Sequence, residues 1–273
     1  MADPRLIKLA QVITEYSTEI KRGDRVFIAA SPIAQPLTLA VIEQVIKRGG
    51  LPHMTGGSGH HLDLVPGALE LMLKYGSDEQ LQYLNPFVKM AIDQFEVRIV
   101  IRSDVNIKSL SNVDPRRIVL MTTASGELTE TMMRRSAAGA LRWVVTQFPT
   151  DAAAQDAEMS LSEYEDFVYG AGMLTDPDPV ARWQEFRLRQ DKYIAWLKGK
   201  QRIHVKGPNC DLVVGITDRI FINSCGLRNF PDGEIFTGPE ETITEGWVNF
   251  TYPLSINSAK CWVPSWNSGR AAW

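Results

Sequence analysis

Apolar residues recur at intervals of three and four near the start of the chain and then give way to a continuous apolar run. Residues 6–20 place apolar side chains on one helical face, and residues 26–30 predict a short buried strand. A second helix is predicted over 36–47, ending at the glycine pair 49–50, and a second strand over 51–55. Helices that alternate with short apolar strands are typical of an open, largely parallel α/β sheet.

The alternation continues through the first two thirds of the chain. Further helices are predicted at 65–75, 78–94 and 126–140. Further strands are predicted at 97–102, 117–122 and 142–146. Strand signals then fade, and two helices, the second of them long, complete the region before residue 200. We therefore expect residues 1–200 to form an N-terminal α/β domain, with an open, mixed but largely parallel sheet and flanking helices.

The pattern changes after residue 200. Short strand-like runs are separated by Gly, Pro, Asn and Asp, which favours antiparallel pairing. We expect residues 201–254 to be the beginning of a smaller α+β domain with antiparallel strands.

Composition narrows the class of protein. The formal net charge is −3, and no basic stripe is present to bind a nucleic-acid backbone. Charged residues interrupt the apolar positions at the N-terminus, and no run of about 18 apolar residues is present, so neither a signal peptide nor a membrane span is expected. The three cysteines, Cys210, Cys225 and Cys261, are widely spaced, which favours reduced thiols. We expect a soluble cytoplasmic protein that binds neither nucleic acid nor membrane.

A glycine-rich segment, GGLPHMTGGSGHH, spans residues 49–61 and holds three of the four histidines. No Lys-Ser/Thr pair follows its glycines and they do not open a helix, so the pattern of a phosphate-binding loop is missing. His60 and His61 are adjacent and point to different faces of a helix or a strand. We interpret the segment as a solvated loop. An α/β enzyme that binds a ligand or metal at His60 and His61 remains an alternative.

A second turn-rich segment, NFPDGEIFTGP, spans residues 229–239 and places Glu234 in an apolar Ile-Phe stretch. A carboxylate in that position favours a nearby cation. One carboxylate alone makes neither a metal site nor an acid/base pair, however, and spacing alone favours an exposed loop glutamate beside Asp232. Spacing by itself leaves the role of Glu234 open.

The longer stretch NFPDGEIFTGPEETITEGWVNFTYP resembles the part of the M29 family of metallo-aminopeptidases in which a loop glutamate binds the catalytic metal. KGPNCDLVVGI, at 206–216, is similar to the Gly-Pro-x-x-Asp-Leu strand of that family. The segment at 148–171 and the opening LAQVITEYSTEIKRGDRVFIAA are similar to it as well. The resemblance extends from residue 5 to about residue 254.

The resemblance implies an exopeptidase that releases N-terminal amino acids from peptides with a free N-terminus. It implies two divalent ions, zinc, cobalt or magnesium, that activate a bridging water. It also implies a homodimer. Glu234 matches the first metal-binding glutamate of the family's motif, and we carry over that residue alone as a metal ligand.

The family's other ligands are a second glutamate, two histidines and an aspartate, and they follow the Tyr-Pro pair found here at 252–253. We expect this chain to hold only the beginning of the metal-binding domain. Residues 255–273 do not resemble the family, and a shift of reading frame near residue 254 would produce such a tail. We therefore expect little peptidase activity, weak metal binding and an exposed strand edge at 248–252. A non-catalytic binding or regulatory protein derived from the family is the alternative.

Overall fold

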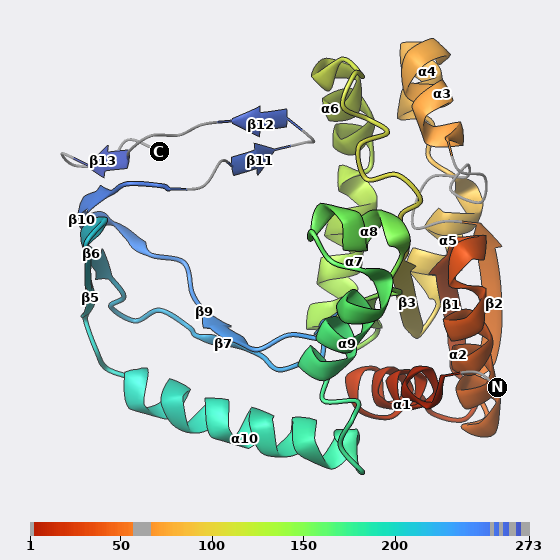
Figure 1. Ribbon diagram of the computed structural model, residues 1–273, viewed down its shortest axis with the longest axis horizontal. Helices are drawn as coiled ribbons and strands as arrows, with labels where there is room; N and C mark the ends of the chain where they lie inside the picture. Colours follow the sequence, from red (N-terminus) through yellow and green to blue (C-terminus); the bar gives the residue numbers. More distant parts are fainter. Residues whose placement is uncertain (1–2, 57–66, 252–253, 257–258, 262–265, 269–273) are drawn as a thin grey trace. The chain divides into compact units, whose positions relative to one another are not determined.

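The structure is a computed structural model (Figure 1). It describes residues 3–56, 67–251, 254–256, 259–261 and 266–268. Two compact units divide the chain: the first comprises residues 1–184 and 226–232, and the second comprises residues 185–225 and 233–273. The first unit is α/β and the second contains antiparallel strands, so the expected fold class is confirmed. The domain limits 1–200, 201–254 and 255–273 stay predictions.

The first unit follows the predicted alternation of helices and strands. Its helices are α1 (Pro4–Val12), the π-helix η1 (Ile13–Ser17), the 3-10 helix η2 (Pro32–Ala34), α2 (Gln35–Lys47), α3 (Ala68–Tyr75), α4 (Asp78–Gln82), α5 (Pro86–Gln94), α6 (Pro115–Ala124), α7 (Gly126–Ala137), α8 (Asp151–Asp156) and α9 (Leu161–Ala171). Its strands are β1 (Arg25–Ala30), β2 (Leu51–Gly56), β3 (Val97–Arg102), β4 (Arg142–Gln147) and β8 (Asn229–Phe230). Helix α10 (Pro179–Leu197) begins in this unit and continues into the second.

The five strands of the first unit form one parallel sheet in the order β2-β1-β3-β4-β8. Chain order reverses between β1 and β3, as it does in doubly wound sheets. Just beyond the carboxyl ends of these two strands, the hydroxyl oxygens of Ser31 and Ser103 lie 2.9 Å apart within hydrogen-bond distance. The switch point of the sheet is therefore closed by a direct side-chain contact.

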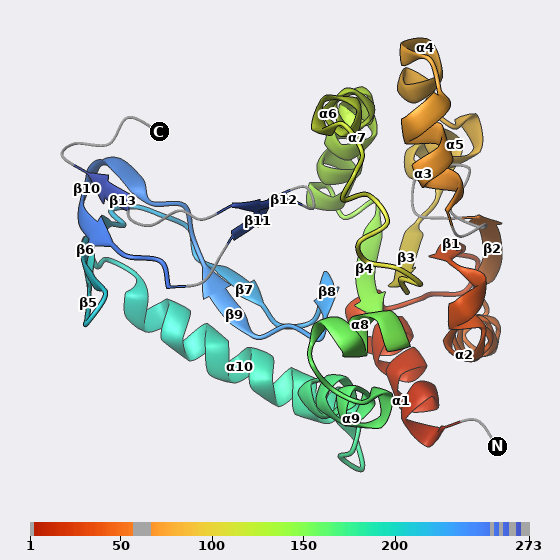
Figure 2. The same cartoon turned by 45° about the horizontal axis from the view of Figure 1, so that its top comes forward.

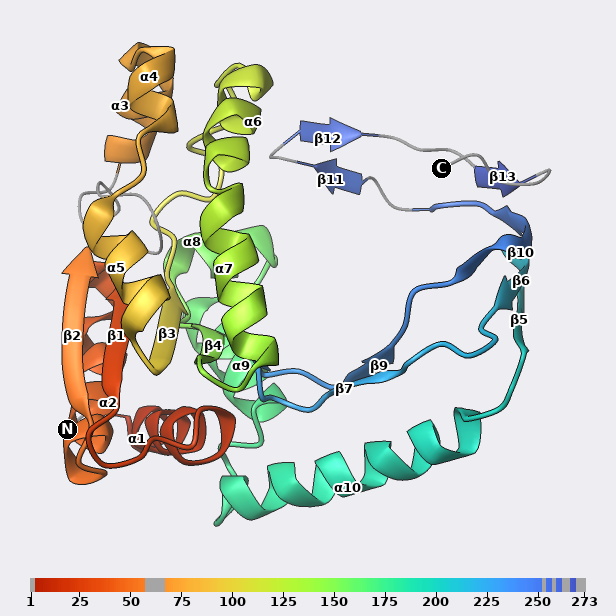
Figure 3. The ribbon, with the colours of Figure 1, turned by 180° about the vertical axis from the view of Figure 1, so that it is seen from behind.

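Side chains on the two faces of the sheet pack against different helices. Figure 3 shows α5 and α7 in front of one face. The buried residues packed between them and the sheet are Phe27, Ala29, Val88, Ala91, Ile92, Phe95, Val100 and Leu128. Alternate strand residues such as Val26, Ile28 and Ile99 point to the opposite face and are also fully buried. Both faces are covered, which explains why the strands read as continuous apolar runs.

Helix starts follow local capping chemistry. The side chain of Asp114 accepts a hydrogen bond from the backbone N–H of Arg116 at 2.9 Å, and Pro115 occupies the first turn. Ser77 and Ser160 each begin a capping box, with Gln80 and Glu163 as the reciprocal partners. These caps fix the ends of helices whose apolar faces are short.

Two sequence predictions in this unit are wrong. Residues 117–122, predicted as a strand, lie within α6, because Asp114 and Pro115 start a helix and Ile118 and Met121 then share its buried face. The single helix predicted over 78–94 is two helices, since Asn85 caps a new helix by accepting from the N–H of Phe87 at 2.9 Å.

The second unit contains antiparallel strands, which the sequence predicted only for residues 201–254. They are β5 (Arg202–Gly207), β6 (Cys210–Gly215), β7 (Ile222–Ser224), β9 (Glu234–Phe236), β10 (Glu240–Val248), β11 (Leu254–Ile256), β12 (Ala259–Cys261) and β13 (Trp266–Ser268). The largest sheet has the order β13-β10-β6-β5. Strand β10 pairs with β6 on one side and, at Gly246–Val248, with β13 on the other. The sequence predicted an exposed strand edge at 248–252, and at Val248 this prediction is wrong because Val248 is paired with Trp266.

The chain returns to the first unit at residues 226–232, a feature that the sequence patterns did not predict. Phe230, 2% exposed, packs with its ring centroid 5.1 Å from that of Trp183, and β8 pairs with the end of β4. The hydroxyl of Ser17 donates to the carbonyl of Gly226 at 2.6 Å. Figure 2 shows β8 at the outer edge of the parallel sheet.

Candidate functional site

Glu234 is the first residue of β9, directly after the segment that returns to the parallel sheet. It is the antiparallel partner of Ser224 in β7, and its side chain is exposed. Gly233 precedes it with φ +148°, a left-handed conformation that favours glycine. Residues 231–233 lie outside any helix or strand, and Glu234 begins a short strand that holds its backbone.

A divalent ion at Glu234 would require several ligand side chains close together. Among the residues that the structure describes, no group of three or more His, Cys, Asp or Glu side chains is placed to hold a metal ion. A zinc ion takes four ligands and magnesium about six, so a single carboxylate satisfies neither. The described residues therefore do not by themselves form a two-ion site.

Of the three histidines in the glycine-rich segment, the structure describes only His53. His53 lies in β2, with its ring centroid 4.9 Å from that of Phe95 in an edge-to-face contact. His60 and His61 lie outside the described residues. His204, which sequence reasoning did not select, lies 2.6 Å from Asp211 on the β5–β6 hairpin, and this hydrogen bond lowers the pKa of the Asp211 carboxyl. Both side chains are close to half exposed, so the pair is a surface interaction.

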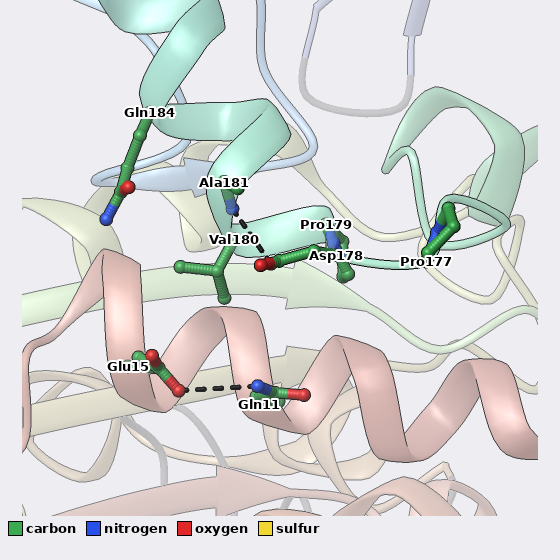
Figure 4. A pocket seen from close by; sticks show the side chains of 8 residues that line it. All are labelled: Gln11, Glu15, Pro177, Asp178, Pro179, Val180, Ala181 and Gln184. Atoms are coloured by element: carbon green, nitrogen blue, oxygen red, sulfur yellow. Dashed lines mark hydrogen bonds between the residues drawn. The ribbon is translucent and has the colours of Figure 1, made fainter.

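A polar pocket of about 400 Å³ lies between the α1–η1 segment and the start of α10 (Figure 4). Its carboxylates are already engaged in holding the fold. Glu15 accepts from Arg48 and, at 3.4 Å, from the amide of Gln11, while Asp178 accepts from the backbone N–H of Ala181 at 3.0 Å. Asp178 therefore caps the start of α10.

Asp176, two residues before Asp178, has a different partner. Asp176 accepts from the side chain of Arg182 at 2.8 Å. The Nζ of Lys8 in α1 donates to its backbone carbonyl at 2.5 Å. Asp176 therefore ties α1 to the turn before α10 and is a structural residue.

Acidic side chains surround Arg5 where α1 contacts α9. Its guanidinium lies 2.7 Å from Asp3, 2.5 Å from Asp166 and 3.7 Å from Glu165, over the ring of Tyr169 at 4.5 Å. The hydrogen bond to Asp3 raises the pKa of Arg5, whereas burial raises the pKa of Glu165 and of Tyr169. The arrangement binds two helices together around a permanent positive charge.

Comparison with known proteins identifies the chain's family. Residues 2–260 match the family described as thermophilic metalloprotease (M29). Aminopeptidase T of Thermus thermophilus is 22% identical over 268 residues, covering 92% of this chain and 65% of that protein. Aminopeptidase 2 of Geobacillus stearothermophilus is 21% identical over 276 residues, covering 93% and 65%, and aminopeptidase PepS of Streptococcus thermophilus is 20% identical over 280 residues, covering 90% and 67%.

The fold agrees with a solved structure. Wild-type AmpT from Thermus thermophilus superposes with a TM-score of 0.74 and 18% identity, over 94% of this chain and 66% of that chain. This chain therefore shares its fold with AmpT. This chain belongs to the M29 metalloprotease family, whose relatives above are named aminopeptidases. It spans about 65% of the length of the first two.

None of the helices in the described part of the chain combines the length and the apolar content that crossing a bilayer demands.

Proposed function

We propose that this chain serves a metal-dependent aminopeptidase that releases N-terminal amino acids from peptides. The observation that carries the proposal is the family match over residues 2–260, together with relatives that are named aminopeptidases. The proposed substrates are peptides with a free N-terminus, and the proposed metal content is two divalent ions, zinc, cobalt or magnesium. A homodimer is proposed as the working assembly.

Glu234 is the proposed metal ligand on this chain. Its position supports the proposal in two ways: the carboxylate is exposed, and the backbone on either side is held by β9 and by the buried Phe230. A ligand whose backbone is fixed loses little freedom when it binds an ion. The chemistry of two ions, a water made acidic enough to attack and a polarised carbonyl, needs further ligands beyond this one.

The described residues supply one proposed ligand, so the polypeptide on its own is expected to bind metal weakly and to release little amino acid. A chain extended after residue 253 with the corresponding C-terminal segment of aminopeptidase T is expected to do both. The two polypeptides should therefore differ in metal content and in activity, because only the extended chain carries the full set of proposed ligands.

The test measures metal content and the release of leucine from leucyl amide by the two polypeptides, with and without added zinc, cobalt or magnesium. We expect about two ions and chelator-sensitive activity in the extended chain, with both reduced by Glu234→Gln. Glu241→Gln, which alters another exposed glutamate on β10, is the matched control and should leave both unchanged.

Either of two results would count against the proposal. Equal activity of the extended chain with Glu234 or Gln at position 234 would remove this residue from the metal site. A folded, extended chain that binds no metal and releases no amino acid would favour the non-catalytic alternative.

A further inference from the structure

Arg228 lies in the segment that returns from the second unit to the parallel sheet. Its backbone carbonyl accepts a hydrogen bond from the N–H of Val145 at 2.7 Å, and two residues later Phe230 joins β4 as strand β8. The Cα of Arg228 is therefore held beside β4 by hydrogen bonds on rigid strands. The side chain starts from a fixed point, which favours a built site over a mobile surface arginine.

The Arg228 guanidinium stacks on the indole of Trp143 in β4, with its carbon 5.6 Å from the ring centroid. Among the described residues, the guanidinium donates to the neighbouring carbonyl of Leu227 at 3.2 Å. No acidic side chain pairs with it anywhere in the described part of the chain. Partial burial lowers the pKa of Arg228, because burial disfavours the charged form.

The indole N–H of Trp143 adds a second donor at the same place. Its nitrogen is buried and finds no acceptor among the described residues. A guanidinium and an indole N–H can only donate hydrogen bonds, so neither satisfies the other. Leaving buried donors without an acceptor costs free energy, and a ligand with acceptor oxygens removes that cost.

The neighbouring strand increases the positive charge on this face of the sheet. Arg98 in β3 is the Cα partner of Trp143, so the two side chains project to the same face. The guanidinium of Arg98 contacts the sulfur of Met132 at 3.3 Å, which places it between the sheet and α7. Arg98 and Trp143 thus share one face of the sheet, and the Arg228 guanidinium reaches the Trp143 ring.

We propose that Arg228 and the indole N–H of Trp143 form a binding site for a small oxyanion at the β4–β8 edge of the parallel sheet. The ligand accepts hydrogen bonds from both groups, and the charge of Arg98 on the same face favours it electrostatically. A carboxylate and a tetrahedral oxyanion such as phosphate share this chemistry. The site lies on elements apart from Glu234 and does not depend on the proposed peptidase function.

The experiment follows the indole N–H resonance of Trp143 in the full ¹⁵N-labelled chain, assigned as the signal absent from Trp143→Phe. Acetate, phosphate and sulfate are titrated separately, with chloride holding ionic strength constant. A site-specific signal is needed because sulfate and phosphate stabilise most proteins through general exclusion from the surface. We expect a saturable shift of this resonance by at least one of the three anions, and little shift by chloride.

Variants of Arg228 test whether this side chain binds the anion. Arg228→Gln should weaken the anion affinity at least tenfold, and Arg228→Lys, which keeps the charge without the planar fork, should weaken it less. Arg116→Gln changes a side chain that is 90% exposed and should leave the titration unchanged. If Arg228→Gln does not fold, the wild-type titration and the lysine variant still decide.

The anion arms distinguish the ligand. Saturation by acetate alone identifies a carboxylate site, and saturation by phosphate and sulfate alone identifies a site for tetrahedral oxyanions. A chemical shift that rises linearly with the concentration of every salt overturns the proposal. So does an anion affinity that is the same in wild type and in folded Arg228→Gln.

Discussion

The carboxylate of Asp24 and the guanidinium of Arg142 meet at 2.7 Å, joining the turn before β1 to the start of β4. Their side chains are only 10% and 20% exposed. Arg142 also donates to the backbone carbonyls of Thr18 and Glu19 at 3.0 and 2.6 Å. One side chain therefore provides hydrogen bonds to two carbonyls that follow η1 and to the carboxylate of Asp24. This pair connects β4 to the N-terminal segment at the base of the sheet.

Replacing Asp24 with Ala leaves the Arg142 charge buried without its counter-ion. We expect Asp24→Ala to lower the free energy of unfolding by about 3 kcal/mol, the usual consequence of removing one member of a buried pair. Chemical denaturation measures it. The matched control is Glu43→Ala, which breaks the exposed Glu43–Lys47 pair and should cost less than about 0.5 kcal/mol. Equal losses in the two variants would contradict the structural role of Asp24.

The contact between Glu96 and Arg25 makes stability depend on acidity. Hydrogen bonds from Arg25 lower the pKa of Glu96 from 4.5 to about 2. A depressed carboxyl pKa stabilises the fold above the unfolded value and loses that contribution as pH falls from about 4.5 toward 2. Because the side chains are 33% and 40% exposed, solvent screening limits the contribution to less than about 1 kcal/mol.

The measurement compares melting temperature against pH for wild-type protein and Glu96→Gln. We expect the difference between the two proteins to be largest near neutral pH and to shrink below pH 4.5. A difference that stays constant from pH 7 to the acid limit would show that Glu96 acts through packing or neutral hydrogen bonds.

Gly246 is required where β10 meets β6. Its φ is +131°, and a Cβ atom there would lie 2.1 Å from the carbonyl oxygen of Asp211. We expect Gly246→Ala to lower the free energy of unfolding by about 2 kcal/mol or more and to speed amide exchange in β6 and β10. Gly238→Ala meets nothing within 4 Å and is the control, with an expected effect below about 0.5 kcal/mol. Similar exchange rates in the two variants would contradict the close approach.

Glu234 should be separable from folding. Its side chain is exposed and has no hydrogen bond or ion pair among the described residues, so Glu234→Gln should change the free energy of unfolding by less than about 0.5 kcal/mol. Thermal melting without added metal is the measurement. A large loss of stability would assign this glutamate a structural role. A loss of activity in Glu234→Gln could then no longer be attributed to metal binding.

Local sequence patterns predicted most elements of the parallel sheet. The run at 97–102 is β3 residue for residue, and the run at 142–146 is β4 without its last residue, because strands buried on both faces show continuous apolar sequence. The same pattern misled at 117–122. A short apolar run is ambiguous between strand and buried helix, and there the cap at Asp114 decided for helix.

Sequence by itself determined the alternation of helix and strand, the antiparallel character of the later strands and, through resemblance, the family and the candidate Glu234. Tertiary structure decided what depends on long-range contact. Strand β8 has two residues and no period to read, so only its pairing with β4 reveals it. The meeting of Arg228 with Trp143 likewise follows from that return of the chain. Periodicity records which face of an element is buried, whereas the partner on that face is set by the packing of the whole fold.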